Sequence, residues 1–296
     1  MDQNPVGIGI AWRGAFEAAL RGMSVAVAAQ GLRTASSMTA ARHRRIVRML
    51  DASARYCWSG RSLHSSANNH LIGELAGLLS IGLLHPELSK PKSLRPKAIE
   101  ALVDHGERQI LADGAGAEQS IAYQMSCVET ISLIVVLLRL DGAQVPDGLS
   151  AVLDRSADYL VGLVGSIDPP PCYGDDDDGF ALRLGAERKR TVREHLGIMA
   201  AVTGNEAAMR YGTLTLTAAW FADAVGTDLS EIGAGIGTDD TPGDFVAPQG
   251  GMVVLRRGRQ RITMDVGALG YLSIAAHGHA DALAVTVSAD GRDLVV

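Results

Sequence analysis

The stretch Ser273-Ile-Ala-Ala-His277-Gly-His279-Ala-Asp281-Ala-Leu283 lies near the C-terminus, next to an alternating segment from Ala284 to Ser288. Its two histidines stand two residues apart, and an aspartate follows two residues later. In a β-strand such residues point to the same face, so an extended chain would direct His277, His279 and Asp281 into one pocket. Imidazole is a proton shuttle near neutral pH and the commonest metal ligand. The stretch therefore predicts strand structure with a catalytic or metal site, against the alternative of a polar strand end with solvated histidines.

The segments around this stretch also alternate between apolar and polar residues, which is the pattern of half-buried strands. They are Met252–Arg256, Arg261–Val266, Leu283–Ser288 and Asp293–Val296. Gly258 and Asp290-Gly291 are predicted to form hairpin turns between them. This predicts an antiparallel sheet that stops in mid-strand at Val296. Because a few strands with an open edge are poorly stable alone, we expect the natural polypeptide to continue and this chain to be a fragment.

The preceding part of the chain has the apolar spacing of helices, so the predicted fold class is mainly α, with helical hairpins before the sheet. The predicted helices are 12–30, 38–58, 71–83, 93–110, 118–141, 149–164, 191–203 and 205–224. Residues 226–250 are rich in Gly, Asp, Thr and Pro and are predicted to be a linker. The predicted domains are therefore a helical part (1–225), the linker (226–250) and the first strands of a truncated β-sandwich (251–296).

The composition limits the function classes. The chain has 296 residues, 47% of them hydrophobic, and a net charge of −6, which argues against a nucleic-acid-binding protein. Three widely spaced cysteines without a CxxC motif make a disulfide framework or a cysteine zinc site unlikely. The longest apolar run, Ile131–Leu138, is too short to span a membrane, and the N-terminus does not resemble a signal peptide.

Two charged runs are interpreted as solvated surface. Four arginines between residues 42 and 48 fit an exposed helix face. The run Asp175–Asp178 follows a Pro-rich segment and lacks the alternation of a calcium-binding EF-hand loop, so a solvated loop is expected there.

Three polar clusters stand out from the apolar helices: Asn68-Asn69-His70 at a helix start, Tyr123 early in a helix, and His277 with His279. Each has a structural alternative, since Asn often caps helices and Tyr often packs in a core. Together they suit β-elimination in a uronic-acid polysaccharide. That reaction requires a neutralised carboxylate, a base that removes the C5 proton and an acid that protonates the leaving O4.

Five segments of the chain resemble the heparinase II/III family of polysaccharide lyases, including its oligo-alginate lyase-like members. These segments are Asn4–Trp12, Glu17–Arg21, His64–Gly77, Glu118–Tyr123 and Gly270–Leu283, the last followed by Ser288-Ala-Asp-Gly-Arg292. The separation of Asn69 and Tyr123, 54 residues, also resembles that of the family.

The resemblance implies an incomplete (α/α) toroid followed by the start of a β-sandwich, with the active site in the cleft between them. It implies that Asn69, helped by His70, neutralises the substrate carboxylate. It also implies that Tyr123 protonates the leaving oxygen, and abstracts the C5 proton where proton and leaving group are syn, while His277 is the base for the opposite epimer or a partner of Tyr123.

Further expectations follow from the same resemblance. Asn68, Glu118 and Tyr271 are expected to bind substrate. His279 resembles the first ligand of the family's structural zinc, whose remaining ligands would follow Val296. The partner is an acidic polysaccharide or oligosaccharide, and the expected location is the periplasm or cell envelope.

Two rival functions remain open. One is a non-catalytic carbohydrate-binding or exopolysaccharide-assembly protein, although such a protein does not need an acid/base pair. The other is a metal-dependent hydrolase that uses His277, His279 and Asp281. Because the chain is poor in basic residues, an unsulfated uronate polymer such as alginate is favoured over a heavily sulfated one.

Overall fold

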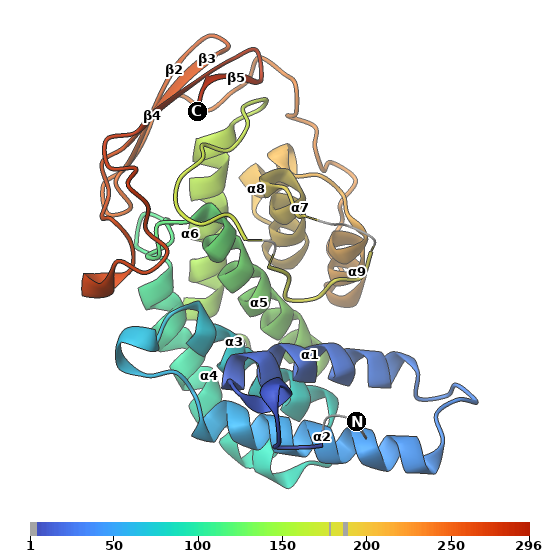
Figure 1. Cartoon of the computed structure of the whole chain (residues 1–296). Helices are drawn as coiled ribbons and strands as arrows, with labels where there is room; N and C mark the ends of the chain where they lie inside the picture. The colour runs from blue at the N-terminus through green and yellow to red at the C-terminus, as the bar shows by residue number, and fades with distance from the viewer. Residues whose placement is uncertain (1–4, 178, 186–188) are drawn as a thin grey trace. The chain divides into compact units, whose positions relative to one another are not determined.

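The computed structural model describes residues 5–177, 179–185 and 189–296 (Figure 1). Their contacts form two compact units. The first comprises Met1–His105 and Leu137–Gln144, and the second comprises Gly106–Val136 and Val145–Val296. The domain boundaries predicted at residues 225 and 250 fall inside the second unit and stay a prediction.

The first unit is built around helix α3 (Asn69–Leu84), whose side chains are buried along nearly its whole length. Helix α1 (Ala15–Gly31) packs against it through small residues. A Cβ added at Gly77 would lie 2.5 Å from that of Ala19, so the two backbones approach closely only because residue 77 is glycine. Helix α2 (Ala40–Ser59) also belongs to this unit, as does α4 (Ser89–Gln109) up to His105. The 3-10 turn η1 (Ile10–Trp12) precedes α1, and η2 (His64–Ser66) lies between α2 and α3.

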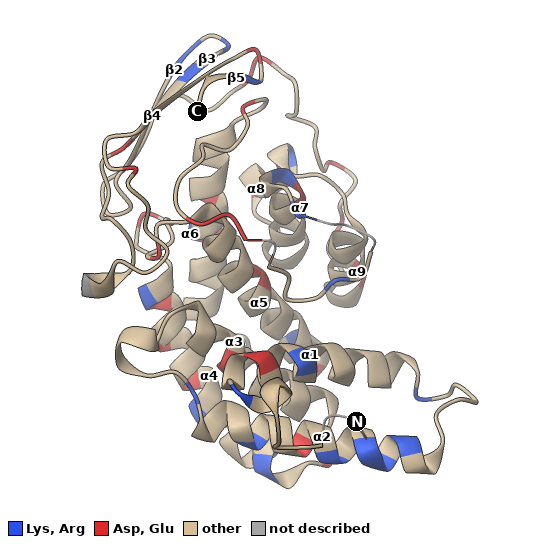
Figure 2. Ribbon diagram, viewed as in Figure 1, with Lys and Arg blue, Asp and Glu red and all other residues tan. Residues whose placement is uncertain are grey.

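Helix α2 buries one face and leaves its first two turns in solvent. Arg42, Arg44, Arg45 and Arg48 are all exposed, and Figure 2 shows Lys and Arg gathered on this helix. The expectation of an exposed helix face is therefore confirmed.

The second unit contains the long helices α5 (Ile121–Leu140, shared with the first unit at its end) and α6 (Asp147–Val164), then α7 (Val192–Thr203). The single helix predicted over 205–224 is wrong. Two short helices, α8 (Glu206–Tyr211) and α9 (Leu216–Val225), replace it. The chain leaves the helix at Gly212, which packs against the Gly197 backbone, and the Thr215 side chain caps the new helix by accepting from the Ala218 N–H at 3.0 Å.

Among the described residues, α5 is the one helix long and apolar enough to cross a membrane by length and composition. The prediction that no run reaches such a length does not hold for this helix. However, 83% of its most apolar window is buried within the structure, as in the core helix of a folded protein.

The C-terminal strands form one antiparallel sheet in chain order, as predicted. They are β1 (Phe245–Ala247), β2 (Met252–Arg257), β3 (Gln260–Asp265), β4 (Val285–Ala289) and β5 (Arg292–Val295). Both predicted turns are confirmed, because Gly258, Asp290 and Gly291 all have positive φ at the hairpin ends. Strand β1 lies in the range predicted as linker.

The sheet is tied to the C-terminal end of α6 by buried arginines. The Arg256 guanidinium donates to the Gly162 carbonyl at 2.7 Å, and Arg261 donates to the Leu163 carbonyl at 3.0 Å. Asp168, just after the helix, lies 3.4 Å from Arg256 and accepts from Ser288 at 2.8 Å. Cations at a helix C-terminus satisfy its free carbonyls and its dipole, so these contacts fix the sheet within the second unit.

Candidate active site

The stretch that carries the two histidines is not an extended strand. It contains a 3-10 turn, η3 (Leu272–Ile274), and folds back so that Tyr271 pairs with Ala276. His277 has a φ of 63°, in the left-handed region. The neighbouring Gly278 backbone lies so close to the Leu269 carbonyl that a Cβ would stand 1.3 Å from it. The predicted alternation of side chains therefore does not hold here.

The reversal nevertheless directs both imidazoles to one carboxylate. His277 Nδ1 lies 3.0 Å from Asp175 Oδ2, and His279 Nε2 lies 2.6 Å from Asp175 Oδ1. Asp281 faces the same loop, because its Oδ2 accepts from the Gly174 N–H at 2.9 Å. The three predicted side chains are therefore not directed at one another. The two histidines contact the side chain of Asp175, and Asp281 contacts the backbone of Gly174.

Tyr123 lies on the first turn of α5 and joins this group from the helical side of the same unit. Its ring stacks on His277 with the centroids 3.8 Å apart and the planes 29° from parallel. Its hydroxyl donates to Asp177 Oδ2 at 2.5 Å. The structure therefore brings together the predicted acid and the predicted base.

A loop after α6 carries the acids that reach these side chains. Gly174 has a φ of 63° and approaches the Gln119 carbonyl so closely that a Cβ would lie 2.0 Å from it. The Ser120 hydroxyl donates to the Asp175 carbonyl at 2.5 Å. Glycine at position 174 and the turn before α5 thus fix where Asp175 stands.

Glu118 and Tyr271, predicted to bind substrate, both lie in this neighbourhood and are buried. Glu118 Oε2 is 3.3 Å from His277 Nε2. Burial raises the pKa of Tyr271, with the charge of Glu118 acting in the same direction. Their predicted role in substrate binding stays a prediction.

Burial and neighbouring charges favour different protonation states for Tyr123 and Asp175. Burial, then the hydrogen bond to Asp177 and the charges of Asp177, Asp175 and Glu118, raise the pKa of Tyr123. Hydrogen bonds from His277 and then His279 lower the pKa of Asp175. Tyr123 is therefore held as a protonated donor, and Asp175 as a charged acceptor.

The other predicted site residues belong to the first unit. The Asn68 side chain accepts from the His70 N–H at 3.1 Å, so Asn68 caps helix α3. Asn69 is buried at the first position of that helix, and the exposed His70 ring stacks on Phe16 with centroids 4.7 Å apart. The helix cap weighed as an alternative for Asn68 is present, and the catalytic roles of Asn69 and His70 stay predictions.

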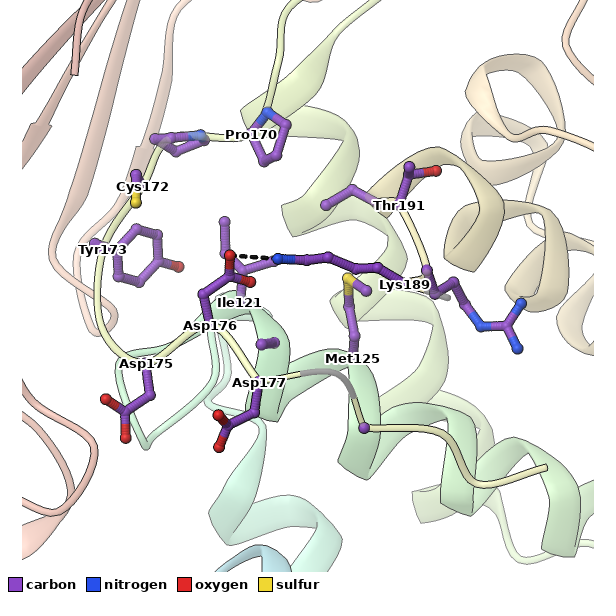
Figure 3. A pocket seen from close by; sticks show the side chains of 15 residues that line it. Ile121, Met125, Pro170, Cys172, Tyr173, Asp175, Asp176, Asp177, Lys189 and Thr191 are labelled. Carbon is purple, nitrogen blue, oxygen red and sulfur yellow. Dashed lines mark hydrogen bonds and ion pairs between the residues drawn. The ribbon is translucent and has the colours of Figure 1, made fainter. Parts of the chain in front are cut away.

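Sequence reasoning missed Asp175 and Asp177, since their run was interpreted as a solvated loop. The loop is solvated as expected, since Asp177 is exposed and Asp175 partly exposed, but these two side chains also contact Tyr123 and His277. Asp178 lies outside the described residues. Figure 3 shows that Asp175 and Asp177 point away from Asp176, whose carboxylate pairs with Lys189 beside a cavity of about 310 Å³. In the sequence, the one local sign that this loop has a defined fold is Gly174, which stands between a Pro-rich segment and the acids.

The described side chains include no group of three or more His, Cys, Asp or Glu residues that could hold a metal ion. A structural zinc site normally has four protein ligands, so His279 and Asp175 by themselves do not form one. Zinc binding by His279 therefore stays a prediction.

Two models of one protein family match the two ends of the chain. The family model described as heparinase II/III N-terminus matches residues 2–175, and the one described as heparinase II/III-like, C-terminal, matches residues 239–296. A crystal structure of heparinase III aligns with 99% of this chain and 44% of its own, at 15% identity and a TM-score of 0.71. Heparan sulfate lyase HepC from Pedobacter heparinus aligns with 99% of this chain and 42% of its own, at 16% identity and a TM-score of 0.63.

This chain thus spans less than half the length of either structure. The two likenesses support the predicted fold, a helical part followed by an antiparallel sheet. A search of curated sequences gives no match.

Proposed function

Because this chain belongs to the heparinase II/III family of polysaccharide lyases, we propose that it cleaves a uronic-acid-containing polysaccharide by β-elimination. The observation that carries the proposal is the contact between the Tyr123 and His277 rings, each with a carboxylate on its polar atom. A proton donor and a proton acceptor within reach of one sugar are what this reaction needs.

In the proposed reaction, a nitrogen of His277 takes the C5 proton of the uronate. The electron pair of the C5–H bond forms the C4–C5 double bond, and the C4–O4 bond breaks. The Tyr123 hydroxyl gives its proton to the departing O4. The raised pKa of Tyr123 favours this division of roles, because a tyrosine that stays protonated is an acid and not a base.

Asn69 and His70 are proposed to bind the uronate carboxylate and reduce its charge, which makes the C5 proton easier to remove. The acids Asp175, Asp177 and Glu118 near the proposed acid and base repel further negative charge on the substrate. An unsulfated uronate polymer is therefore the proposed substrate class. By the family resemblance, the proposed location is the periplasm or cell envelope.

The test is to incubate the protein with alginate, heparan sulfate and unsulfated glucuronate polymers and to follow the ultraviolet absorbance of the unsaturated product. We expect a rise with one polymer that disappears in Tyr123→Phe. Tyr56→Phe removes a hydroxyl that donates to the Arg13 carbonyl in the first unit, and serves as the matched control. A folded protein that binds a polymer without forming unsaturated product would instead support a carbohydrate-binding role.

A further inference from the structure

We propose that three arginines on helix α2, Arg44, Arg48 and Arg55, bind an acidic polysaccharide outside the reaction centre and direct the polymer towards Asn69. We call these three residues the arginine row. This inference rests on the proposed function, since it concerns how the substrate of the proposed elimination is held.

The first argument is the distribution of charge along the chain. Residues 1–63 contain nine arginines, no lysine and three acids, which gives a net charge of +6. The other 233 residues contain 18 lysines and arginines against 30 acids, which gives −12. Glu118, Asp175 and Asp177 add to the negative charge around the proposed acid and base. A polyanion is therefore attracted by the N-terminal part of this chain and repelled by the remainder.

The second argument is that the three arginines are aligned. An α-helix turns by about 100° per residue, so Arg44, Arg48 and Arg55 lie within about 40° of one another around the axis of α2. Steps of four and seven residues place them about 6 Å and about 10 Å apart along that axis. All three are exposed, on the helix where Figure 2 shows several Lys and Arg side chains. A uronic-acid polymer carries carboxylates at regular intervals, so one chain can contact several members of the row at once.

The third argument is the hydrogen-bonding capacity of these side chains. The one acid on α2, Asp51, contacts Nε of Arg55 at 2.8 Å, and the Arg55 side chain stays 54% exposed. A guanidinium has five N–H donors, so Arg55 still offers its terminal nitrogens to a carboxylate in the bidentate geometry. Arg42 differs from the row, because it donates to the Ser37 carbonyl of its own chain segment.

The apolar face of α2 separates a polymer from a lipid surface as the partner. A helix that binds a membrane surface inserts an apolar face that lies next to its charges. In α2 the apolar residues Met49, Leu50 and Ala54 are buried inside the first unit, where the helix packs against α1 and α3. The exposed side of α2 therefore offers charge without an inserting face, which favours a hydrophilic polyanion.

The row also leads towards a residue of the proposed reaction. Helix α2 ends at Ser59, α3 begins at Asn69, and the two helices pack together in the first unit. Because residues 60–68 form a short connection, the end of α2 and the start of α3 lie at the same end of the helix pair. A polymer held along the row is therefore directed to the residue that is proposed to bind the reacting uronate.

The test removes the charges of the row at nearly constant side-chain length, in one variant that combines Arg44→Gln, Arg48→Gln and Arg55→Gln. The matched control combines Lys90→Gln, Lys92→Gln and Lys97→Gln, which removes the same charge from exposed positions of α4 in the same unit. Calorimetry measures the binding of long-chain alginate, heparan sulfate and an unsulfated glucuronate polymer. All variants also carry Tyr123→Phe, so that the polymer stays intact.

We expect the row variant to bind one of these polymers about tenfold more weakly, because each exposed ion pair contributes a few-fold to affinity and three are removed. Its log Kd should also depend less steeply on log salt concentration, since fewer counterions are released. The control variant should bind as the parent does. A uronate trisaccharide is too short to contact both the row and Asn69, so its affinity should be the same in the row variant and the parent.

The binding measurement and the cleavage assay fail separately. With Tyr123 intact, the row variant should show a raised KM for the long polymer at unchanged kcat. Row-dependent binding without any unsaturated product would refute the proposed reaction and leave the row as a polyanion site. Three results would overturn the inference itself: no binding of any polymer, equal affinity in the row variant and its parent, or the same loss in the control. Row-dependent binding to vesicles of phosphatidylglycerol and phosphatidylcholine, with polymer affinity unchanged, would also overturn it and assign the row to a membrane surface.

Discussion

Replacing Gly174 with alanine should destabilise the second unit and disturb the site, for two separable reasons. The φ of 63° costs an L-residue about 1–2 kcal/mol relative to glycine. The new Cβ would also stand 2.0 Å from the Gln119 carbonyl oxygen, which is a backbone atom and has little freedom to move. Relieving such an overlap typically costs about 1–3 kcal/mol. The expected loss in the free energy of unfolding is therefore about 2–5 kcal/mol.

Gly204 provides a matched control in the same unit. It caps α7 with a φ of 71°, and a Cβ there would meet no atom within 4 Å. Gly204→Ala should therefore show only the conformational part of the loss, about 1–2 kcal/mol. Urea unfolding followed by circular dichroism measures both variants, and the midpoints are compared at unchanged slope.

The same pair of variants tests whether the loop supports the site. Moving residue 174 shifts Asp175, so Gly174→Ala should also change the nitrogen-15 chemical shifts of the His277 ring and reduce product formation, whereas Gly204→Ala should change neither. If the two variants lose the same stability and leave His277 unaltered, then the loop has room for a Cβ, and the close approach to Gln119 does not place Asp175.

The helix cap and a buried histidine give two further predictions. Asn68→Ala removes the cap of α3 and should lower the free energy of unfolding by about 1 kcal/mol in urea titrations. Asn69→Ala should abolish lyase activity, and equal activity in the two variants would contradict the proposed role of Asn69. Burial lowers the pKa of His195 to about 3, below its ordinary value of 6.5. Between these pH values the unfolded chain therefore binds more protons than the folded chain. The free energy of unfolding should then fall as the pH drops from about 6.5 towards 3, by up to ~1.4 kcal/mol per pH unit. His195→Leu should flatten this slope in unfolding measurements at several pH values, and an unchanged slope would assign it to other groups.

Local sequence signals predicted the elements whose causes are local. Most helices begin and end within a few residues of the predicted positions, because apolar spacing and caps such as Asn68 and Thr191 act within one or two turns. The turn at Asp290-Gly291 followed from residues that tolerate positive φ. Tyr123 and His277 were also identifiable as candidates, since their residue types and motifs are visible in the sequence.

Tertiary structure decided the features that depend on distant partners. The helix break at Gly212 follows from backbone packing against Gly197, and the fold of residues 273–283 departs from the alternation that its sequence suggested. The contact between Asp175 and His277 joins residues that lie 102 positions apart in the chain. No local pattern encodes such a partner, because an acid without a tertiary contact and an acid that contacts an imidazole can have the same neighbours in the chain. They differ only in what folding brings to the carboxylate.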